Sequence, residues 1–86
     1  MEISVELTFS PLQNQFEKPI QEFIKTLRSS GFEILENPLS TQVYGDYTQV
    51  MTFLTAAIEK SLGDVDNGLF YMKIVKSDRS DYVPNF

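Results

Sequence analysis

The sequence EISVELTFS, residues 2–10, alternates strictly between polar and apolar side chains. Successive side chains of a β-strand point to opposite faces, so this period of two predicts a half-buried strand. The core face of that strand would carry Ile3, Val5, Leu7 and Phe9. Pro11 is predicted to end the strand, and residues 12–18 are predicted to form a polar loop.

Two amphipathic helices are predicted further along the chain. The first begins at Pro19, because a proline at the first helical position loses no hydrogen bond, and it ends before Gly31. The second begins after Asp46, which we expect to act as the N-cap with Gln49 as its capping-box partner, and it ends at Gly63. Apolar side chains recur every three or four residues in both helices. They are Ile20, Phe23, Ile24 and Leu27 in the first helix, and Val50, Phe53, Leu54, Ala57 and Ile58 in the second.

Three more strands are predicted over residues 32–36, 40–45 and 69–76. The order strand, helix, strand, strand, helix, strand indicates an α+β fold. It predicts a ferredoxin-like βαββαβ sandwich, in which two helices cover one face of a four-stranded antiparallel sheet. We expect one domain over residues 1–77 and a C-terminal tail over residues 78–86, because the final residues show no periodicity.

The composition excludes many kinds of active site. The chain has 86 residues, a formal charge of −5, and neither Cys nor His. Disulfides, thiolate metal sites and the commonest catalytic base are therefore absent. We expect no enzymatic activity, no cofactor and no bound metal. The seven Lys and Arg residues are scattered along the chain, which argues against nucleic acid as a partner. The sequence has no signal peptide and no apolar span, so we expect a soluble cytoplasmic protein without membrane contact.

Several functions found on this fold lack their characteristic residues here. A metal-carrying domain needs a Cys pair, which is absent. An RNA-recognition domain needs basic residues beside aromatic ones, whereas the strand over residues 40–45 has Tyr44 but no Lys or Arg. An acylphosphatase needs an Arg in a Gly-rich loop after the first strand, and residues 10–18 contain neither. The segment DVDNG, residues 64–68, has the wrong spacing for a calcium loop and is predicted to form a turn.

The face of the sheet that the helices leave open is predicted to mix polar, charged and aromatic side chains. They are Ser4, Glu6, Thr8, Gln42, Tyr44, Tyr71, Lys73 and Val75. We expect Lys73 to pair with Glu6 across the strands. A second subunit, or a ligand held between subunits, would cover this face. If Glu6 becomes buried there, it must be paired or bound to a ligand, and Tyr44 and Tyr71 could hold a flat ring between them.

Four segments of the chain resemble the YkoF-like thiamine-binding family. They are MEISVELTFSPL (1–12), PIQEFIKTLRSSGFEI (19–34), NPLSTQVYGDYTQVM (37–51) and YMKIVKSDRSD (71–81). The most specific feature is the pattern Ser-Thr-x-x-x-Gly over residues 40–45. Many members of the family carry Glu before that glycine, whereas this chain has Tyr44, so a role that depends on that carboxylate is not carried over.

The resemblance implies a ferredoxin-like fold that forms dimers or tetramers through its sheets. It also implies non-catalytic binding of thiamine or its hydroxymethylpyrimidine precursor in the cytoplasm. Ser, Thr, Gln and Glu side chains match the donors and acceptors of an aminopyrimidine, and aromatic side chains favour a thiazolium cation. The expected ligand-binding residues are Glu6, Thr8, Ser10, Ser40, Thr41, Gln42, Tyr44 and Tyr71. Of these, Thr41 is predicted to point to the opposite face from Ser40, Gln42 and Tyr44.

Two other functions are compatible with the same residues. The chain could be a regulatory module that binds another small metabolite, as the fold allows by analogy. It could also be a structural or adaptor subunit, and this alternative predicts a dry interface with no cavity near residues 40–44.

Overall fold

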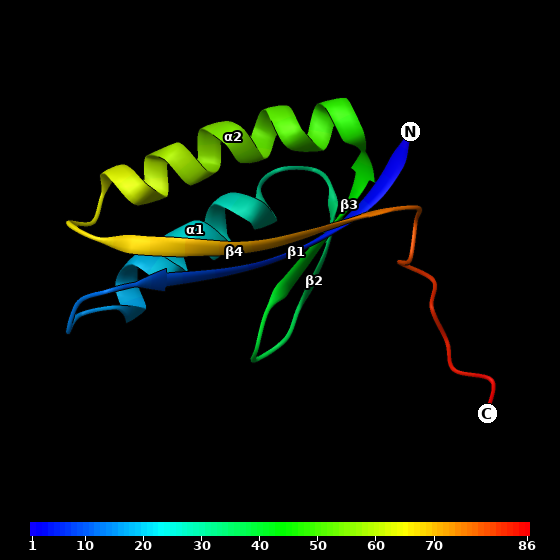
Figure 1. Cartoon of the computed structure of the whole chain (residues 1–86), viewed down its shortest axis with the longest axis horizontal. Helices are drawn as coiled ribbons and strands as arrows, with labels where there is room; N and C mark the ends of the chain where they lie inside the picture. Colours follow the sequence, from blue (N-terminus) through cyan, green and yellow to red (C-terminus); the bar gives the residue numbers. More distant parts are fainter.

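The computed structural model describes residues 1–86 and contains six elements. They are β1 (Glu2–Pro11), α1 (Glu17–Arg28), β2 (Glu33–Glu36), β3 (Thr41–Asp46), α2 (Tyr47–Gly63) and β4 (Gly68–Lys76). The four strands form one antiparallel sheet in the order β2-β3-β1-β4. Figure 1 shows this sheet with α1 and α2 packed beside it. The predicted ferredoxin-like arrangement is confirmed. Neither helix is long and apolar enough to cross a membrane.

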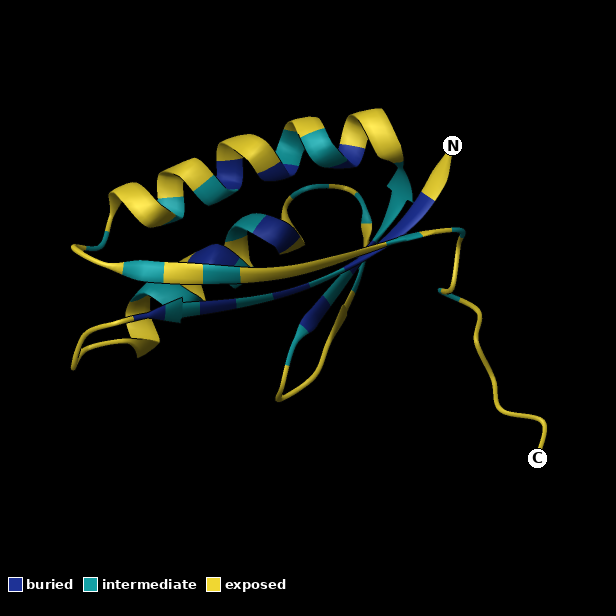
Figure 2. Ribbon diagram, in the orientation of Figure 1, coloured by how far each residue is buried: buried dark blue, intermediate teal, exposed yellow.

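The core lies between the sheet and the helices. All four predicted apolar residues of β1 are buried, and they form one cluster with Phe23 and Leu27 of α1 and with Val50 and Leu54 of α2. Figure 2 shows the buried segments on β1 and on the helix turns that face it. Because one strand contacts both helices through one set of side chains, both helices cover the same face of the sheet.

Aromatic side chains close one end of this core. The rings of Phe9 and Phe70 are stacked with their centroids 4.4 Å apart. Phe23 meets both rings at steep interplanar angles, at 5.9 Å and 4.9 Å respectively. Offset stacking and edge-to-face packing are the favoured geometries of aromatic pairs. These contacts fix α1 against β1 and β4.

Some element boundaries differ from the sequence-based prediction. Helix α1 begins at Glu17, so Pro19 is its third residue rather than its first. This position also suits a proline, because the first N–H groups of a helix have no partner within the helix. Strand β1 includes Pro11, which faces Gly68, and β3 runs from Thr41 to Asp46, one residue later than predicted.

The start of α2 is held by Asp46, as predicted. Its carboxylate accepts a hydrogen bond from the Gln49 backbone N–H at 3.3 Å and lies 3.2 Å from the amino group of Met1. The Gln49 hydrogen bond and the positive amino terminus lower the pKa of the Asp46 carboxyl. A pKa that is lower in the folded state stabilises the fold above the unfolded-state value, and this contribution disappears as the pH falls through the folded-state value.

We expect Asp46→Ala to lower the melting temperature at neutral pH, because the first turn of α2 loses its cap. The difference from the wild type should shrink as the pH falls through the pKa of Asp46. Thermal unfolding across a pH series measures both effects, with Asp81→Ala in the exposed tail as the control. Equal melting temperatures of Asp46→Ala and wild type at neutral pH would contradict the role of this cap.

After β4 the chain leaves the body without further helix or strand, as Figure 1 shows. Its first residues remain attached to β1. The Ser4 hydroxyl donates a hydrogen bond to the Ser77 carbonyl at 2.8 Å and accepts one from the Arg79 backbone N–H at 2.9 Å. The later residues are exposed, including Tyr82, Val83 and Phe86. The start of the tail is therefore part of the open sheet face.

Candidate functional site

The open face of the sheet has Glu6 near its centre. Strand β1 lies between β3 and β4, and the strand register places Glu6 opposite Gln42 on one side and opposite Lys73 on the other. Opposed residues of antiparallel strands point to the same face, so these three side chains meet. The alternation of β1 that buries Leu7 therefore places Glu6 on the side away from the helices.

The Glu6 carboxylate is surrounded by hydrogen-bond donors. The Ser40 hydroxyl donates to Oε2 at 3.0 Å, and the Gln42 amide donates to the same oxygen at 3.5 Å and to the Ser40 oxygen at 3.0 Å. The Lys73 ammonium lies 3.9 Å from Oε1, which is the predicted ion pair. About two-fifths of the Glu6 side chain is exposed, so this pair contributes little to stability. The carboxylate remains accessible to a ligand.

A local turn positions Ser40 for this contact. The Asn37 side-chain oxygen accepts hydrogen bonds from the backbone N–H groups of Leu39 and Ser40, at 3.0 Å and 2.9 Å. The Thr8 hydroxyl donates to the Leu39 carbonyl at 3.2 Å and ties the same turn to β1. An asparagine side chain that mimics a backbone turn in this way fixes where the next strand begins. The turn formed by Asn-Pro-Leu-Ser, residues 37–40, thus places the Ser40 hydroxyl within hydrogen-bonding distance of Glu6.

A shallow hollow of about 180 Å³ lies beside Glu6 on the open face. Gln42 and Lys73 line it from the flanking strands, and Tyr44 and Arg79 line it toward the start of the tail. Partial burial raises the pKa of the Tyr44 hydroxyl, and the nearby charges of Glu33, Asp78 and Glu6 raise it further. The phenol therefore stays protonated near neutral pH and can donate a hydrogen bond into a hollow whose lining includes one carboxylate, Glu6, and two cations, Lys73 and Arg79.

The predicted site residues fall into three groups. Glu6, Ser40, Gln42 and Tyr44 lie together around the network and the hollow. Thr8, Ser10 and Tyr71 lie on the same face, but further along β1 and β4. Thr8 faces Tyr71, Ser10 faces Leu69, and the Tyr71 side chain is mostly exposed. Tyr44 and Tyr71 therefore do not face each other within one chain.

Thr41 lies apart from the other predicted residues. It is paired with Leu7 of β1, and it lies on the helix side of the sheet with only 5% of its surface exposed. It lines a separate hollow of about 250 Å³ between α1 and the turn that joins β2 to β3. The sheet itself lies between Thr41 and Glu6, so the two side chains cannot contact the same small ligand on the open face.

The sequence analysis missed the residues that the tail contributes. Arg79 lines the hollow and Asp78 lies near Tyr44. The hydrogen bonds of Ser4 to Ser77 and to Arg79, on either side of Asp78, hold this segment against β1. The alternation of β1 places Ser4 on the open face, but no period or motif in the tail indicates that it returns there. No group of three or more acidic side chains could hold a metal ion.

No family model matches this sequence, and no curated protein matches it. The fold of this chain does resemble those of several solved structures. One is a Thermotoga maritima protein that is described provisionally as acting in thiamine biosynthesis or salvage. Its sequence is 15% identical to this chain, and the two structures superpose with a TM-score of 0.82 over 90% of this chain and 85% of that chain. Protein SP2199 of Streptococcus pneumoniae is 23% identical with a TM-score of 0.85, over 94% of this chain and 92% of that one. A Bacillus cereus domain of unknown function is 11% identical with a TM-score of 0.77, over 91% and 78%. At these identities the likeness shows the shared fold.

Proposed function

We propose that this protein binds thiamine or its hydroxymethylpyrimidine precursor, without chemical conversion, on the open face of its sheet. The observation that carries the proposal is the partly exposed Glu6 carboxylate, which accepts from Ser40 and Gln42, pairs with Lys73 and lies beside an aromatic ring. An adaptor subunit with a dry interface would leave no hollow near Tyr44, whereas this face has one. The Thermotoga neighbour with its provisional thiamine role supports the same ligand class.

The chemistry of the patch fits an aminopyrimidine. Its exocyclic amino group can donate to Glu6, and its ring nitrogens can accept from Ser40 or Gln42. Tyr44 offers a face for stacking and a hydroxyl for a further hydrogen bond. The Tyr44 ring and the Glu6 carboxylate can both contact a cationic thiazolium. The absence of His and Cys from the chain supports binding without catalysis.

A second subunit completes this site in our proposal. The open face exposes large apolar side chains around the polar patch. Leu35 is 54% exposed, Leu69 is 47% exposed and Tyr71 is 70% exposed. Apolar surface rimmed by polar groups is typical of interaction sites. We therefore propose a cytoplasmic homo-oligomer that associates through its sheets and encloses the ligand.

Thermal unfolding tests the proposed ligand class. Thiamine at about a hundred times its Kd should stabilise the protein by about 2.7 kcal/mol, which corresponds to a rise of about 10–20 °C in the melting temperature of a domain of this size. Choline carries a cation without the aromatic rings, and uracil carries a pyrimidine without the amino group, so both serve as controls. Measurement at two protein concentrations separates ligand binding from assembly. The proposal fails if neither thiamine nor hydroxymethylpyrimidine raises the melting temperature.

A further inference from the structure

The hollow beside Glu6 carries more positive than negative charge. Its lining contains one carboxylate, Glu6, and two cations, Lys73 and Arg79, so its formal charge is +1. The whole chain carries −5, which makes this excess of cations a local feature. Thiamine and hydroxymethylpyrimidine have no anionic group, so the binding of these two compounds does not use Arg79.

The Arg79 guanidinium is free to meet an anion. Arg79 is exposed and forms no ion pair within the chain. The carboxylate of the neighbouring Asp78 accepts from the Ser80 backbone N–H at 2.9 Å, and the hydrogen bonds from Ser80 lower the pKa of the Asp78 carboxyl. Glu33 and Asp78 lie near enough to Tyr44 to raise the pKa of its hydroxyl, but neither of them lines the hollow.

Ser4 fixes the place where Arg79 joins the hollow. The Ser4 hydroxyl accepts a hydrogen bond from the Arg79 backbone N–H at 2.9 Å and donates one to the Ser77 carbonyl at 2.8 Å. Ser4 itself is only 8% exposed, and it lies two residues before Glu6 on β1. Two residues of a strand span about 7 Å. The backbone of Arg79 is therefore held close to Glu6, although the two residues lie at opposite ends of the sequence.

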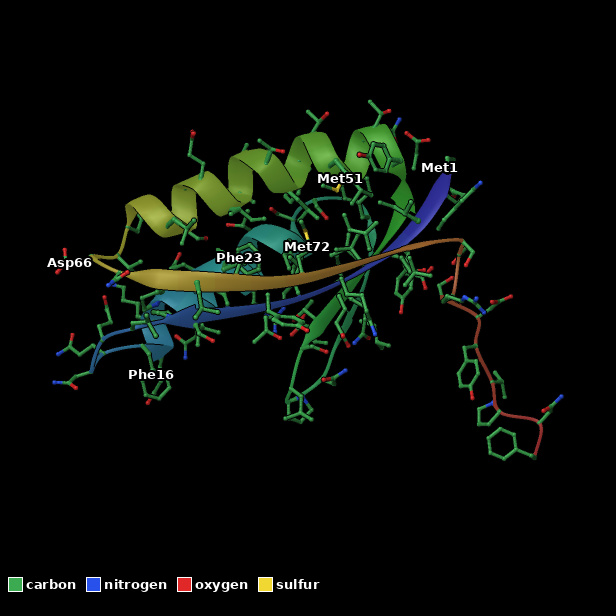
Figure 3. The ribbon with its side chains drawn as sticks, in the orientation of Figure 1. Met1, Phe16, Phe23, Met51, Asp66 and Met72 are labelled. Carbon is green, nitrogen blue, oxygen red and sulfur yellow. The ribbon has the colours of Figure 1, made fainter.

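Lys73 reaches the same hollow from β4. Figure 3 shows the preceding residue, Met72, on the helix side of this strand, so Lys73 points to the open face. Its ammonium lies 3.9 Å from Oε1 of Glu6, and 64% of its side chain is exposed. An ammonium group has three N–H donors. Lys73 can therefore keep its contact with Glu6 and donate to a ligand as well.

We propose that the hollow accepts a phosphate group of the ligand between Arg79 and Lys73, so that the protein binds a phosphate monoester of its aminopyrimidine ligand more tightly than the free alcohol. This inference rests on the proposed function, in which Glu6 receives the ligand amino group. The planar fork of Arg79 matches two phosphate oxygens, and the Tyr44 hydroxyl can donate to the third. A phosphate monoester carries a charge of about −1.5 to −2 at neutral pH, which offsets the excess of cations.

The size of the hollow indicates that it holds one end of the ligand. Sites for whole small molecules usually have about 300–1,000 Å³, whereas this hollow has about 180 Å³. Two phosphate esters place their phosphate at different distances from the aminopyrimidine. Hydroxymethylpyrimidine phosphate carries it one carbon from the ring, whereas thiamine phosphate carries it beyond the thiazolium. The two compounds therefore test two lengths between the amino group and the phosphate.

Calorimetric titration with each ester and its alcohol, in a buffer without phosphate, tests the inference. The wild type should bind at least one ester about tenfold to a hundredfold more tightly than its alcohol, which is the effect of a hydrogen bond to a charged group. In Arg79→Gln this ratio should fall toward one. Lys76→Gln is the matched control, because Lys76 is exposed, forms no ion pair and lies opposite the buried Ile3 on the helix side. It removes the same charge and should keep the wild-type ratio.

Phosphorus NMR of inorganic phosphate provides a measurement that needs no thiamine. The wild-type protein should broaden or shift the phosphate resonance, and Arg79→Gln should lose most of this effect, whereas Lys76→Gln should keep it. Circular dichroism confirms that both variants fold.

The outcomes separate this inference from the proposed function. Equal affinity of the wild type for esters and alcohols, or equal effects of Arg79→Gln and Lys76→Gln, would overturn the phosphate site and leave the binding of thiamine standing. If neither thiamine nor hydroxymethylpyrimidine binds, the proposed function fails, and the phosphate resonance still decides the inference. An unchanged resonance would then overturn it, and a change that depends on Arg79 would support it.

Discussion

Glu6→Gln should weaken the binding of thiamine by about tenfold to a hundredfold, because a hydrogen bond to a charged group contributes about 1.5–3 kcal/mol. The substitution keeps the shape of the side chain and an oxygen that can accept from Ser40. It removes the negative charge that receives the ligand amino group and leaves the Lys73 ammonium without its partner. Calorimetric titration of the variant and the wild type measures the ratio of the two dissociation constants.

Glu59→Gln is the matched control for this experiment. Glu59 is exposed on α2, on the helix side of the sheet, and makes no ion pair in the structure. The substitution changes the net charge by the same amount as Glu6→Gln, so it should leave the affinity unchanged. Equal affinity of Glu6→Gln and the wild type, in variants with the same oligomeric state, would remove Glu6 from the binding site.

Leu54→Ala should cost about 2–5 kcal/mol of unfolding free energy, because a fully buried leucine loses its packing and leaves a cavity. Leu54 has no exposed surface and contacts the core from the middle of α2. For a domain of this size the loss corresponds to about 10–40 °C in melting temperature. Denaturant unfolding, with the slope compared between variants, measures the change directly.

Leu62→Ala in the same helix is the control for Leu54→Ala. Leu62 is 38% exposed near the end of α2 and lies outside the buried cluster. It should lose less than half as much stability as Leu54→Ala. If both variants lost the same amount, the core would not be centred on the sheet side of α2 as described.

The fold could be predicted because its signals are local and periodic. The alternation of β1, the spacing of Phe23 and Leu27 in α1, and the Asp46 cap each specify one element through nearby residues. The exact ends of the strands do not follow from local sequence, because a terminal residue is fixed by its partner on another strand. Pro11, for example, belongs to β1 because it faces Gly68.

The site could be predicted only where it follows from the strands. Glu6, Gln42 and Lys73 were placed together because they alternate with core residues on paired strands. Thr41 was included through the family pattern, and its alternation places it on the other face, where the structure has it. Arg79 and Asp78 could not be found, because their position depends on hydrogen bonds between the tail and Ser4, across more than seventy residues of sequence.

Calorimetric titration of the wild-type protein with thiamine, thiamine phosphate and hydroxymethylpyrimidine tests the central claim most directly. The oligomeric state of the sample should be measured first by sedimentation. We predict saturable binding of thiamine or hydroxymethylpyrimidine, with one site per chain and an affinity that falls in Glu6→Gln. The absence of heat with all three compounds, at two temperatures so that a zero enthalpy is excluded, would contradict the proposed function.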